Sequence, residues 1–255
     1  MYDGETMSEP TVCAIMLTRD RPELAKKAVE CFRSQTYAAK RILVADNSMC
    51  PEALDGLLVD IPVGYAWSCG AEGTIGAMRN QANAVARAAD IIVHWDDDDW
   101  SHPNRIAEQV ALLQASGADC VGYNEMLFWR EPRAFGTALV TPLNGEAWLY
   151  GYGPPKPTLG TSLCYWRKTW ERKPFRNDLP RNGESTGEDW EFIQGLKVMA
   201  VSSLHPWAGD NLRAHPRMIA RIHGGNSVKY NLEYSNGTCW SRAPEWDHRV
   251  KELLG

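Results

Sequence analysis

Short apolar runs alternate with segments of helical periodicity through the first half of the chain. Such runs, bounded by polar residues, are typical of buried strands, whereas apolar positions at helical spacing are typical of amphipathic helices. Strands that are separated by helices favour right-handed parallel crossovers, so we predict an α/β fold with a mostly parallel sheet. The expected strands are 12–17, 42–45, 91–93 and 120–123, and the expected helices are 24–32, 77–89 and 104–115.

The helical spacing also predicts which side chains face the core. The inward faces are expected to carry Met78, Ala82 and Val85 in the second helix and Ile106, Val110 and Leu113 in the third.

Beyond Glu125 the pattern becomes less regular. A Gly- and Pro-rich segment at 151–160 predicts a loop, which we interpret as a mobile loop on the substrate side. Because no repeat or low-complexity tract is visible and this segment is too short for a domain linker, we predict a single domain. The other expected elements are strands at 126–129, 138–141 and 148–152 and a helix at 188–197.

Four consecutive aspartates, residues 96–99, follow the predicted strand at 91–93 and lie between Trp95 and Trp100. Four like charges repel one another unless they share protons or bind a cation. In an α/β sheet, the carboxyl end of a strand is where ligands bind. Carboxylate oxygens suit Mg²⁺ or Mn²⁺, and such ions often take further ligands from phosphate. The run therefore predicts a metal centre for a phosphate-bearing substrate, with an acidic surface turn as the alternative.

Composition and charge narrow the class of protein. The chain has 255 residues, a hydrophobic content of 44% and a formal net charge of -5, which argues against coating nucleic acid by bulk electrostatics. Its seven cysteines form no CxxC pair, which favours a reducing compartment. Neither a secretory leader nor an apolar run of roughly 18 to 20 residues is visible, so we expect a cytoplasmic chain without a transmembrane segment.

Six short motifs then occur in a recognisable order. They are 17–24 (LTRDRPEL), 34–37 (SQTY), 44–48 (VADNS), 76–80 (GAMRN), the aspartate run with Trp100 and Pro103, and 187–189 (GED). Together they resemble the family 2 glycosyltransferases, which are inverting enzymes that use nucleotide sugars, and the resemblance spans about 12–226. It implies a GT-A fold, in which a Rossmann-like nucleotide-binding half with a mostly parallel central sheet flanked by helices precedes an acceptor-side second half.

The resemblance also implies a division of the chain. We expect a flexible N-terminus at 1–10, a nucleotide-sugar-binding half at 11–124, an acceptor-binding and catalytic half at 125–230, and a C-terminal extension at 231–255.

The same resemblance assigns residues to the donor. Thr18 and Asp46 are expected to hold the nucleoside, since a carboxylate can accept the imide N–H of a pyrimidine ring. A turn cap is the alternative for Asp46. Arg79 is expected to pair with phosphate oxygens or to brace the acidic residues, unless it is a surface arginine. Asp96 and Asp97 are assigned to the donor side, with Asp96 facing the ribose or the water shell of the metal.

The metal ligands and the base follow from the resemblance as well. Asp98 is the expected ligand of Mn²⁺ or Mg²⁺, with Asp99 behind it, and His223 is the candidate additional ligand. Asp189 is the expected general base, because the second acid of the family's acidic pair usually has that role. Glu188 and Trp190 are assigned to the acceptor side. Acids in a first helical turn can instead simply stabilise the helix dipole.

Two departures concern the nucleoside pocket. Arg19 stands where the family usually has Asn, and Asn47 stands where it usually has a second acid. A UDP-sugar remains the expected donor, ahead of dTDP- and GDP-sugars, while the class of hydroxyl acceptor and the oligomeric state stay open. Further candidates to face the diphosphate are Arg217 and Arg221. Two or three aromatic residues are expected to line the acceptor cleft, and the candidates are Trp148, Tyr150, Tyr152, Trp166 and Trp170.

Two other functions remain open at this point. A sugar nucleotidyltransferase shares the sheet and the acidic metal site, but a Gly-rich basic signature near the N-terminus is not visible. A non-catalytic sugar- or nucleotide-binding relative is the other alternative, against which the intact aspartate run and the Glu188-Asp189 pair argue.

Overall fold

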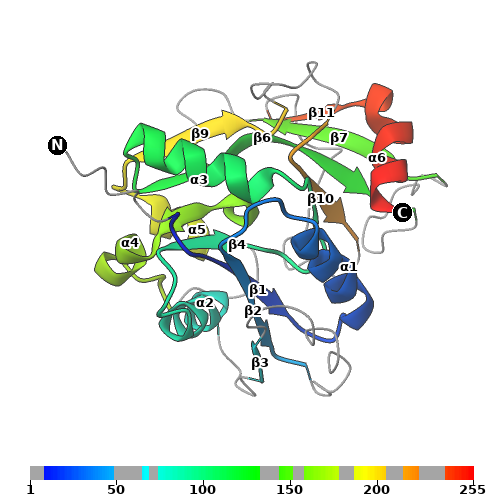
Figure 1. The fold of residues 1–255 in the computed structure, drawn as a ribbon. Coiled ribbons are helices and arrows are strands. Elements are labelled where there is room, and N and C mark those ends of the chain that lie inside the picture. The colour runs from blue at the N-terminus through cyan, green and yellow to red at the C-terminus, as the bar shows by residue number, and fades with distance from the viewer. Residues whose placement is uncertain are drawn as a thin grey trace.

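The first half of the chain is a parallel α/β unit. The computed structural model describes residues 9–48, 65–68, 74–132, 144–151, 158–177, 187–204, 215–223 and 239–255. In the first half its strands are β1 (Val12–Thr18), β2 (Lys40–Asp46), β3 (Tyr65–Ser68) and β4 (Ile91–His94), and its helices are α1 (Pro22–Arg33), α2 (Ile75–Val85) and α3 (Arg105–Ser116). β1 pairs in parallel with β2 and β4, and β2 pairs in parallel with β3, which confirms the predicted parallel sheet (Figure 1).

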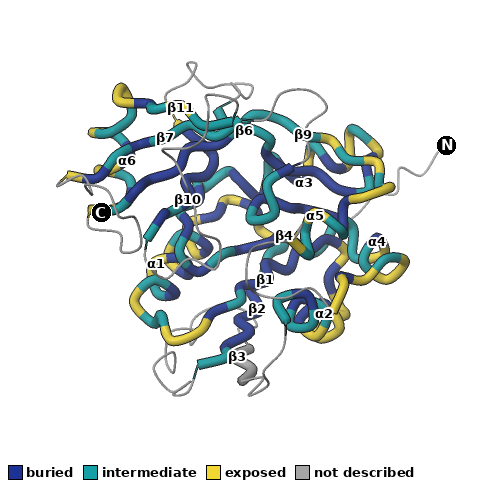
Figure 2. The backbone as a smooth tube through the Cα atoms, turned by 180° about the vertical axis from the view of Figure 1, so that it is seen from behind, coloured by how far each residue is buried: buried dark blue, intermediate teal, exposed yellow. Residues whose placement is uncertain are grey.

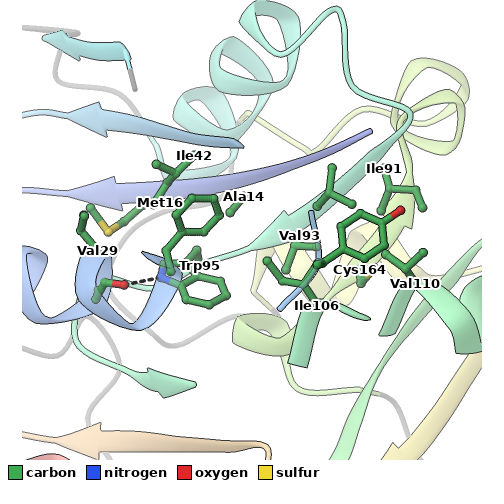
Figure 3. Close-up of a cluster of buried hydrophobic side chains, with 14 of the residues drawn as sticks. Ala14, Met16, Val29, Ile42, Ile91, Val93, Trp95, Ile106, Val110 and Cys164 are labelled. Carbon is green, nitrogen blue, oxygen red and sulfur yellow. Dashed lines mark hydrogen bonds between the residues drawn. The ribbon is translucent and has the colours of Figure 1, made fainter. Parts of the chain in front are cut away.

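Alternation along β1 supplies both faces of this sheet. Val12, Ala14 and Met16 pack under α1 and α3, where they meet Phe32, Trp95 and Ile106. Figure 3 shows this cluster, in which the indole Nε1 of Trp95 donates to the carbonyl of Ala28 at 3.0 Å. Cys13 and Ile15 point to the other face and pack with α2. β1 and β4 are buried, as Figure 2 shows, and each packs on both of its faces. Their sequences are therefore continuous apolar runs rather than alternating apolar and polar residues.

The second half is built around one long strand, β6 (Cys120–Arg130). Its first part lies between β8 (Cys164–Trp166) and β9 (Val198–Ser202), and its second part lies between β7 (Glu146–Gly151) and β10 (Met218–Ile222). β8 also pairs antiparallel with β4, so the described strands of both halves form one sheet with the order β3-β2-β1-β4-β8-β6-β7-β11.

Smaller elements complete the second half. They are β5 (Trp100–Ser101), β11 (Trp240–Arg242), α4 (Arg167–Arg172), α5 (Glu188–Ile193), α6 (Asp247–Leu254) and 3-10 turns at Gly160–Ser162 and Pro244–Trp246. β11 pairs with β7, and Val250 and Leu254 of α6 pack on Leu127 and Trp129 of β6. No helix in the described ranges is long and apolar enough to cross a membrane. The cysteines of these ranges, Cys13, Cys31, Cys120, Cys164 and Cys239, are free thiols.

The predicted second helix is wrong at its end and in its inward face. The helix ends at Val85 rather than Ala89, and Val85 is 49% exposed. Residues 86–90 form the connection from α2 to β4 instead of a further helical turn. The backbone N–H groups of Asp90 and Ile91 both bind the carbonyl of Thr11, and these bonds place the start of β4 beside β1. The buried face carries Gly76, Arg79, Ala82 and Asn83, two of which are polar, so an apolar period could not identify it. In α3 the predicted face is confirmed.

Two further predicted boundaries are corrected. The helix expected to reach Lys197 ends at Ile193, because Gly195 adopts a φ of +74° and Lys197 then donates its backbone N–H to Asp119. The separate strands expected at 120–123 and 126–129 are one strand with an irregularity between Tyr123 and Glu125. The strand expected at 138–141 lies outside the described residues.

Candidate active site

The aspartate run bridges β4 and β5 at the carboxyl end of the parallel strands. Trp95 anchors its start, since it is buried in the core and its backbone N–H binds the carbonyl of Ile15 on β1 at 3.0 Å. At the other end, Trp100 and Ser101 of β5 pair with β10. The four carboxylates therefore lie on a turn whose two ends are fixed by the sheet.

Three of these acids form a cluster that fits a divalent cation. Asp96, Asp98 and Asp99 each offer one oxygen, and these oxygens all lie within 4.8 Å of one another. The imidazole Nε2 of His223 lies 3.0 Å from Oδ2 of Asp98. Carboxylate oxygens with one imidazole nitrogen suit Mn²⁺ and, without the nitrogen, Mg²⁺. The donor set is therefore one that a divalent metal can use.

Asp97 is held apart from this cluster by residues at the end of β1. The register that pairs Ile15 with His94, continued past the end of β4, aligns Asp97 with Thr18, the last residue of β1. The hydroxyl of Thr18 donates to Oδ2 of Asp97 at 2.6 Å. The guanidinium of Arg21 lies 2.9 Å from Asp97 and 2.9 Å from Asp98. Burial and Asp98 raise the pKa of Asp97 to about 7, although Arg21 and Thr18 stabilise its charged form.

Asp99 is bound by the second half of the molecule. Its Oδ2 accepts from the hydroxyl of Thr161 at 2.6 Å, and its Oδ1 accepts from the backbone N–H of Arg221 at 3.2 Å. Burial, together with Asp98 and Asp96, raises the pKa of Asp99 well above its ordinary value. Without a cation, a proton on this acid is the least costly way to relieve the crowding of charge.

Arg79 of α2 connects the aspartate run to the first turn of α5. Its side chain is 8% exposed, and its Nε donates to Oε1 of Glu188 at 3.0 Å, while its Nη2 lies 3.9 Å from Oδ1 of Asp96. Burial opposes the charge of Arg79, but Glu188, Asp96 and Asp189 outweigh it and raise its pKa. Of the two roles expected for Arg79, this geometry is that of a brace between acidic groups.

Asp189 lies next to that brace and against a glycine. A methyl group on Gly160 would overlap Oδ2 of Asp189, so the Cα of Gly160 directly adjoins the carboxylate. Its Oδ1 accepts from the backbone N–H of Trp190 at 2.9 Å. Desolvation and Glu188 raise the pKa of Asp189 to about 6, although Arg79 lowers it. A carboxylate with that pKa is ionised at neutral pH and still able to accept a proton.

Asp46 ends β2 beside Thr18, its partner in the β1–β2 register. It is 1% exposed, and its Oδ1 accepts from the backbone N–H of Ser48 at 2.8 Å, as in an Asx turn. Its Oδ2 has no hydrogen-bond partner among the described residues. Asp46 is thus both a turn cap and a buried acceptor with one oxygen available.

Several other expected residues have structural contacts instead. The guanidinium of Arg217 pairs with Glu108 at 2.6 Å, and that of Arg221 pairs with Glu131 at 2.9 Å. Tyr150 packs on Trp240, with ring centroids 4.4 Å apart. The remaining expected aromatics pack on the core except Trp190, which is 37% exposed at the first turn of α5; they are Trp148, Trp166 and Trp170, while Tyr152 lies outside the described residues.

Three residues of the site were not predicted from the sequence, namely Arg21, Thr161 and Gly160. Arg21 stands inside the first motif, directly before α1, and that position was the available signal. The acidic run also borders a cavity of about 510 Å³ between α1, β5 and the end of α6, which Asp98, Asp99 and Arg221 help to line. In Figure 1, α1 and α6 both lie on the right of the molecule.

A family model for glycosyl transferase family 2 matches residues 13–138, which include all of β1 except Val12, together with Asp46, α2 and the whole aspartate run. Residues 13–138 therefore belong to glycosyl transferase family 2. A search of curated proteins found no significant match for this family 2 chain.

Solved structures share the fold of the family 2 chain. S. aureus TarS, residues 1–349, aligns with a TM-score of 0.57 at 13% identity, over 83% of this chain and 60% of TarS. Its complex with UDP-GlcNAc aligns with a TM-score of 0.57 at 13% identity, over 96% and 65%. The mannosyltransferase PcManGT from Pyrobaculum calidifontis, solved with GDP-Man and Mn²⁺, aligns with a TM-score of 0.56 at 16% identity, over 80% and 59%.

The family 2 chain covers less than two thirds of the length of each of these structures. At such identities the likeness establishes the fold alone. The expected GT-A architecture, a largely parallel central sheet flanked by helices, is confirmed.

Proposed function

We propose that this family 2 chain transfers a sugar from a nucleoside-diphosphate sugar to an acceptor hydroxyl with inversion, using a divalent metal, with Asp189 as general base. The observation that carries the proposal is the position of Arg79. Its buried guanidinium contacts Asp96 of the aspartate run on one side and Glu188, the neighbour of Asp189, on the other. The residues proposed to bind the sugar donor and the residue proposed to accept the proton therefore border one site, as a transfer reaction requires.

The metal would be held by the cluster of Asp96, Asp98 and Asp99, with His223 as a fourth candidate ligand. A bound Mn²⁺ or Mg²⁺ would offset the negative charge that the departing nucleoside diphosphate carries. The PcManGT structure with GDP-Man and Mn²⁺ supports a divalent metal in a protein of this fold. Arg21 supplies fixed positive charge at the same place, because it bridges Asp97 and Asp98.

Asp189 would take the proton of the acceptor hydroxyl. The acceptor oxygen forms a bond to the anomeric carbon while the bond from that carbon to the diphosphate oxygen breaks, so a single displacement inverts the configuration. Hydrogen bonding to the N–H of Trp190 fixes one oxygen of Asp189, and the other remains for the proton. The acceptor is proposed only as a hydroxyl compound that reaches this carboxylate.

A UDP-sugar is the proposed donor. The support is Asp46, whose buried Oδ2 is an acceptor without a partner among the described residues and can receive the imide N–H of uracil. TarS structures with UDP-GlcNAc and with UDP point the same way, whereas the PcManGT structure contains GDP-Man. The donor test therefore has to include guanine as well as pyrimidine nucleotides.

The first experiment is a thermal-shift panel of UDP-, dTDP- and GDP-sugars with and without Mn²⁺. A true donor stabilises the folded state by mass action, by about 2.7 kcal/mol at a hundred times its Kd. We expect one UDP-sugar to raise the Tm only when Mn²⁺ is present, and D98N to lose that response. A matched control is E191Q, which should respond like the wild type, because the Glu191 carboxylate lies 4.0 Å from the guanidinium of Arg176 rather than beside the aspartate run. No shift with any donor would contradict the proposal.

A turnover assay then tests Asp189. The D189N variant should still show the donor- and Mn²⁺-dependent Tm shift but should release no UDP above background in the presence of acceptors. Loss of both properties, or of neither, would contradict the assignment of Asp189 as the base.

A further inference from the structure

The 3-10 turn Gly160–Ser162 contacts both groups of acids on which the proposed function depends. Thr161 donates its hydroxyl to Asp99 at 2.6 Å. The Cα of the adjacent Gly160 adjoins the carboxylate of Asp189 so closely that a side chain there would overlap it. One turn of chain therefore lies between the aspartate run and the proposed base.

Three buried side chains hold this turn by its carbonyl groups. The carbonyl of Gly160 lies 2.8 Å from Nδ1 of His94, the carbonyl of Thr161 accepts from Arg105 at 3.2 Å, and that of Ser162 accepts from Gln109 at 2.7 Å. His94 is 1% exposed, Arg105 is 0% exposed and Gln109 is 1% exposed. Because consecutive carbonyls have separate buried partners, the turn is far better fixed than a surface loop.

Arg105, one of the three side chains that hold the turn, is a fully buried cation. Its guanidinium also donates to the carbonyl of His94 at 2.8 Å and to Ser101 at 2.9 Å, and it lies over the ring of Trp95. Removing a guanidinium from water is costly, and a core that only needed stability would use an apolar side chain here. The buried arginine instead joins the end of β4, the end of β5 and the turn in one network.

We propose that Gly160 and Thr161 are positioning residues, which fix the carboxylate of Asp189 and the carboxylate of Asp99 relative to each other. The proposal rests on the proposed function, because it assigns those two acids to opposite parts of one reaction. Gly160 provides the space that Asp189 occupies, and Thr161 orients Asp99 through its hydroxyl. The turn thus belongs to the fixed part of the site, although its first residue, Gly160, ends the segment 151–160 that was expected to be a mobile loop and of which 152–157 lie outside the described residues.

The first test is G160A. The added methyl group forces the Asp189 carboxylate to rotate, and a displacement of about 1 Å typically lowers a rate by about 100-fold. We expect kcat to fall by about that factor, with the KM for the donor within about twofold of the wild type. The matched control is G151A, whose added methyl meets only ordinary contacts at 3.5 Å and which should leave kcat unchanged. A wild-type kcat in G160A, or an equal loss in G151A, would overturn the role of Gly160.

The second test uses Thr161 and does not depend on turnover. The T161V variant removes the hydroxyl that orients Asp99, and loss of such a partner typically lowers metal affinity by about 10- to 100-fold. We expect calorimetry to show that loss for Mn²⁺ in T161V and recovery in T161S, which keeps the hydroxyl. Unchanged Mn²⁺ affinity in T161V, or no recovery in T161S, would overturn the role of Thr161.

The two proposals can fail separately. If the wild type releases no UDP from any donor while T161V still weakens Mn²⁺ binding and T161S restores it, the catalytic proposal fails and the positioning of Asp99 stands. If the wild type is active and both turn variants behave like it, the positioning proposal alone fails.

Discussion

At the scale of single residues, the surroundings of Asp189 determine how it responds to pH. Desolvation and Glu188 raise the pKa of Asp189 to about 6. The ionised fraction of this carboxylate therefore decreases as the pH is lowered below this pKa. We therefore predict that kcat/KM declines about tenfold for each pH unit below about 6. The measurement is a pH-rate profile, with donor binding followed over the same range to separate this limb from weaker binding. A profile that stays flat down to pH 5 would contradict the prediction.

The same residue predicts a gain in stability. Its pKa is raised above the ordinary 3.8, so its ionised form disfavours the folded state as pH rises through about 6. D189N removes that cost and should raise the free energy of unfolding at pH 8 by at most about 3 kcal/mol. At pH 4, the advantage should disappear. Urea unfolding of both proteins at the two pH values measures the difference, and an equal gain at both would indicate another cause.

Residue by residue, the sequence could identify the acids but not their separate partners. The motif order indicated Thr18, Asp98 and Glu188, all of which lie in the candidate site. It placed Asp97 on the donor side together with Asp96 and could not set the two apart, because a turn has no period from which to infer the direction of a side chain. Asp97 is set apart from its neighbours only by the continuation of the β1–β4 register, and that register depends on strand pairing.

At the scale of elements, the packing of α1 on the sheet depends on Trp95. This side chain is 1% exposed and its indole N–H binds the carbonyl of Ala28. Replacing it with alanine leaves a cavity between α1 and α3, so W95A should lower the free energy of unfolding by about 3 to 5 kcal/mol. W190A is the matched control, since Trp190 is 37% exposed, and it should change stability by about 0.5 kcal/mol or less. Denaturant unfolding compares the two, and equal losses would contradict the burial argument.

Elements with a strong period were predicted well, and elements defined by long-range pairing were not. β1, β2, β4, α1 and α3 were expected close to their observed bounds, because each has its own apolar pattern. β8 and β9 were not expected, since each is short and depends on pairing with strands that are distant in the sequence, β4 and β6 for β8 and β6 for β9. The turn Gly160–Ser162 was missed for the same reason, because its partners come from β4 and α3.

At the scale of the whole molecule, crowded carboxylates make the metal-free protein sensitive to pH. The pKa of Asp97 is raised to about 7 and that of Asp189 to about 6, so both groups contribute most to stability below about pH 4, where they are protonated in either state. That contribution is lost as pH rises towards 7. We predict that the slope of Tm against pH is less negative in D97N than in the wild type when chelator is present, and that Mn²⁺ raises the wild-type Tm more at pH 8 than at pH 6. Identical slopes would contradict the prediction.

The sharing of β6 between the two halves has a consequence for how the molecule opens. Its first part joins β8 and β9, its second part joins β7 and β10, and β8 in turn pairs with β4. Neither half can therefore lose its sheet without exposing the edge of the other. In native-state hydrogen exchange, the amides of Val121 and Phe128 should exchange only through global unfolding, with the same free energy and the same dependence on denaturant. The chain should accordingly melt as one cooperative unit, with a calorimetric enthalpy equal to its van't Hoff enthalpy.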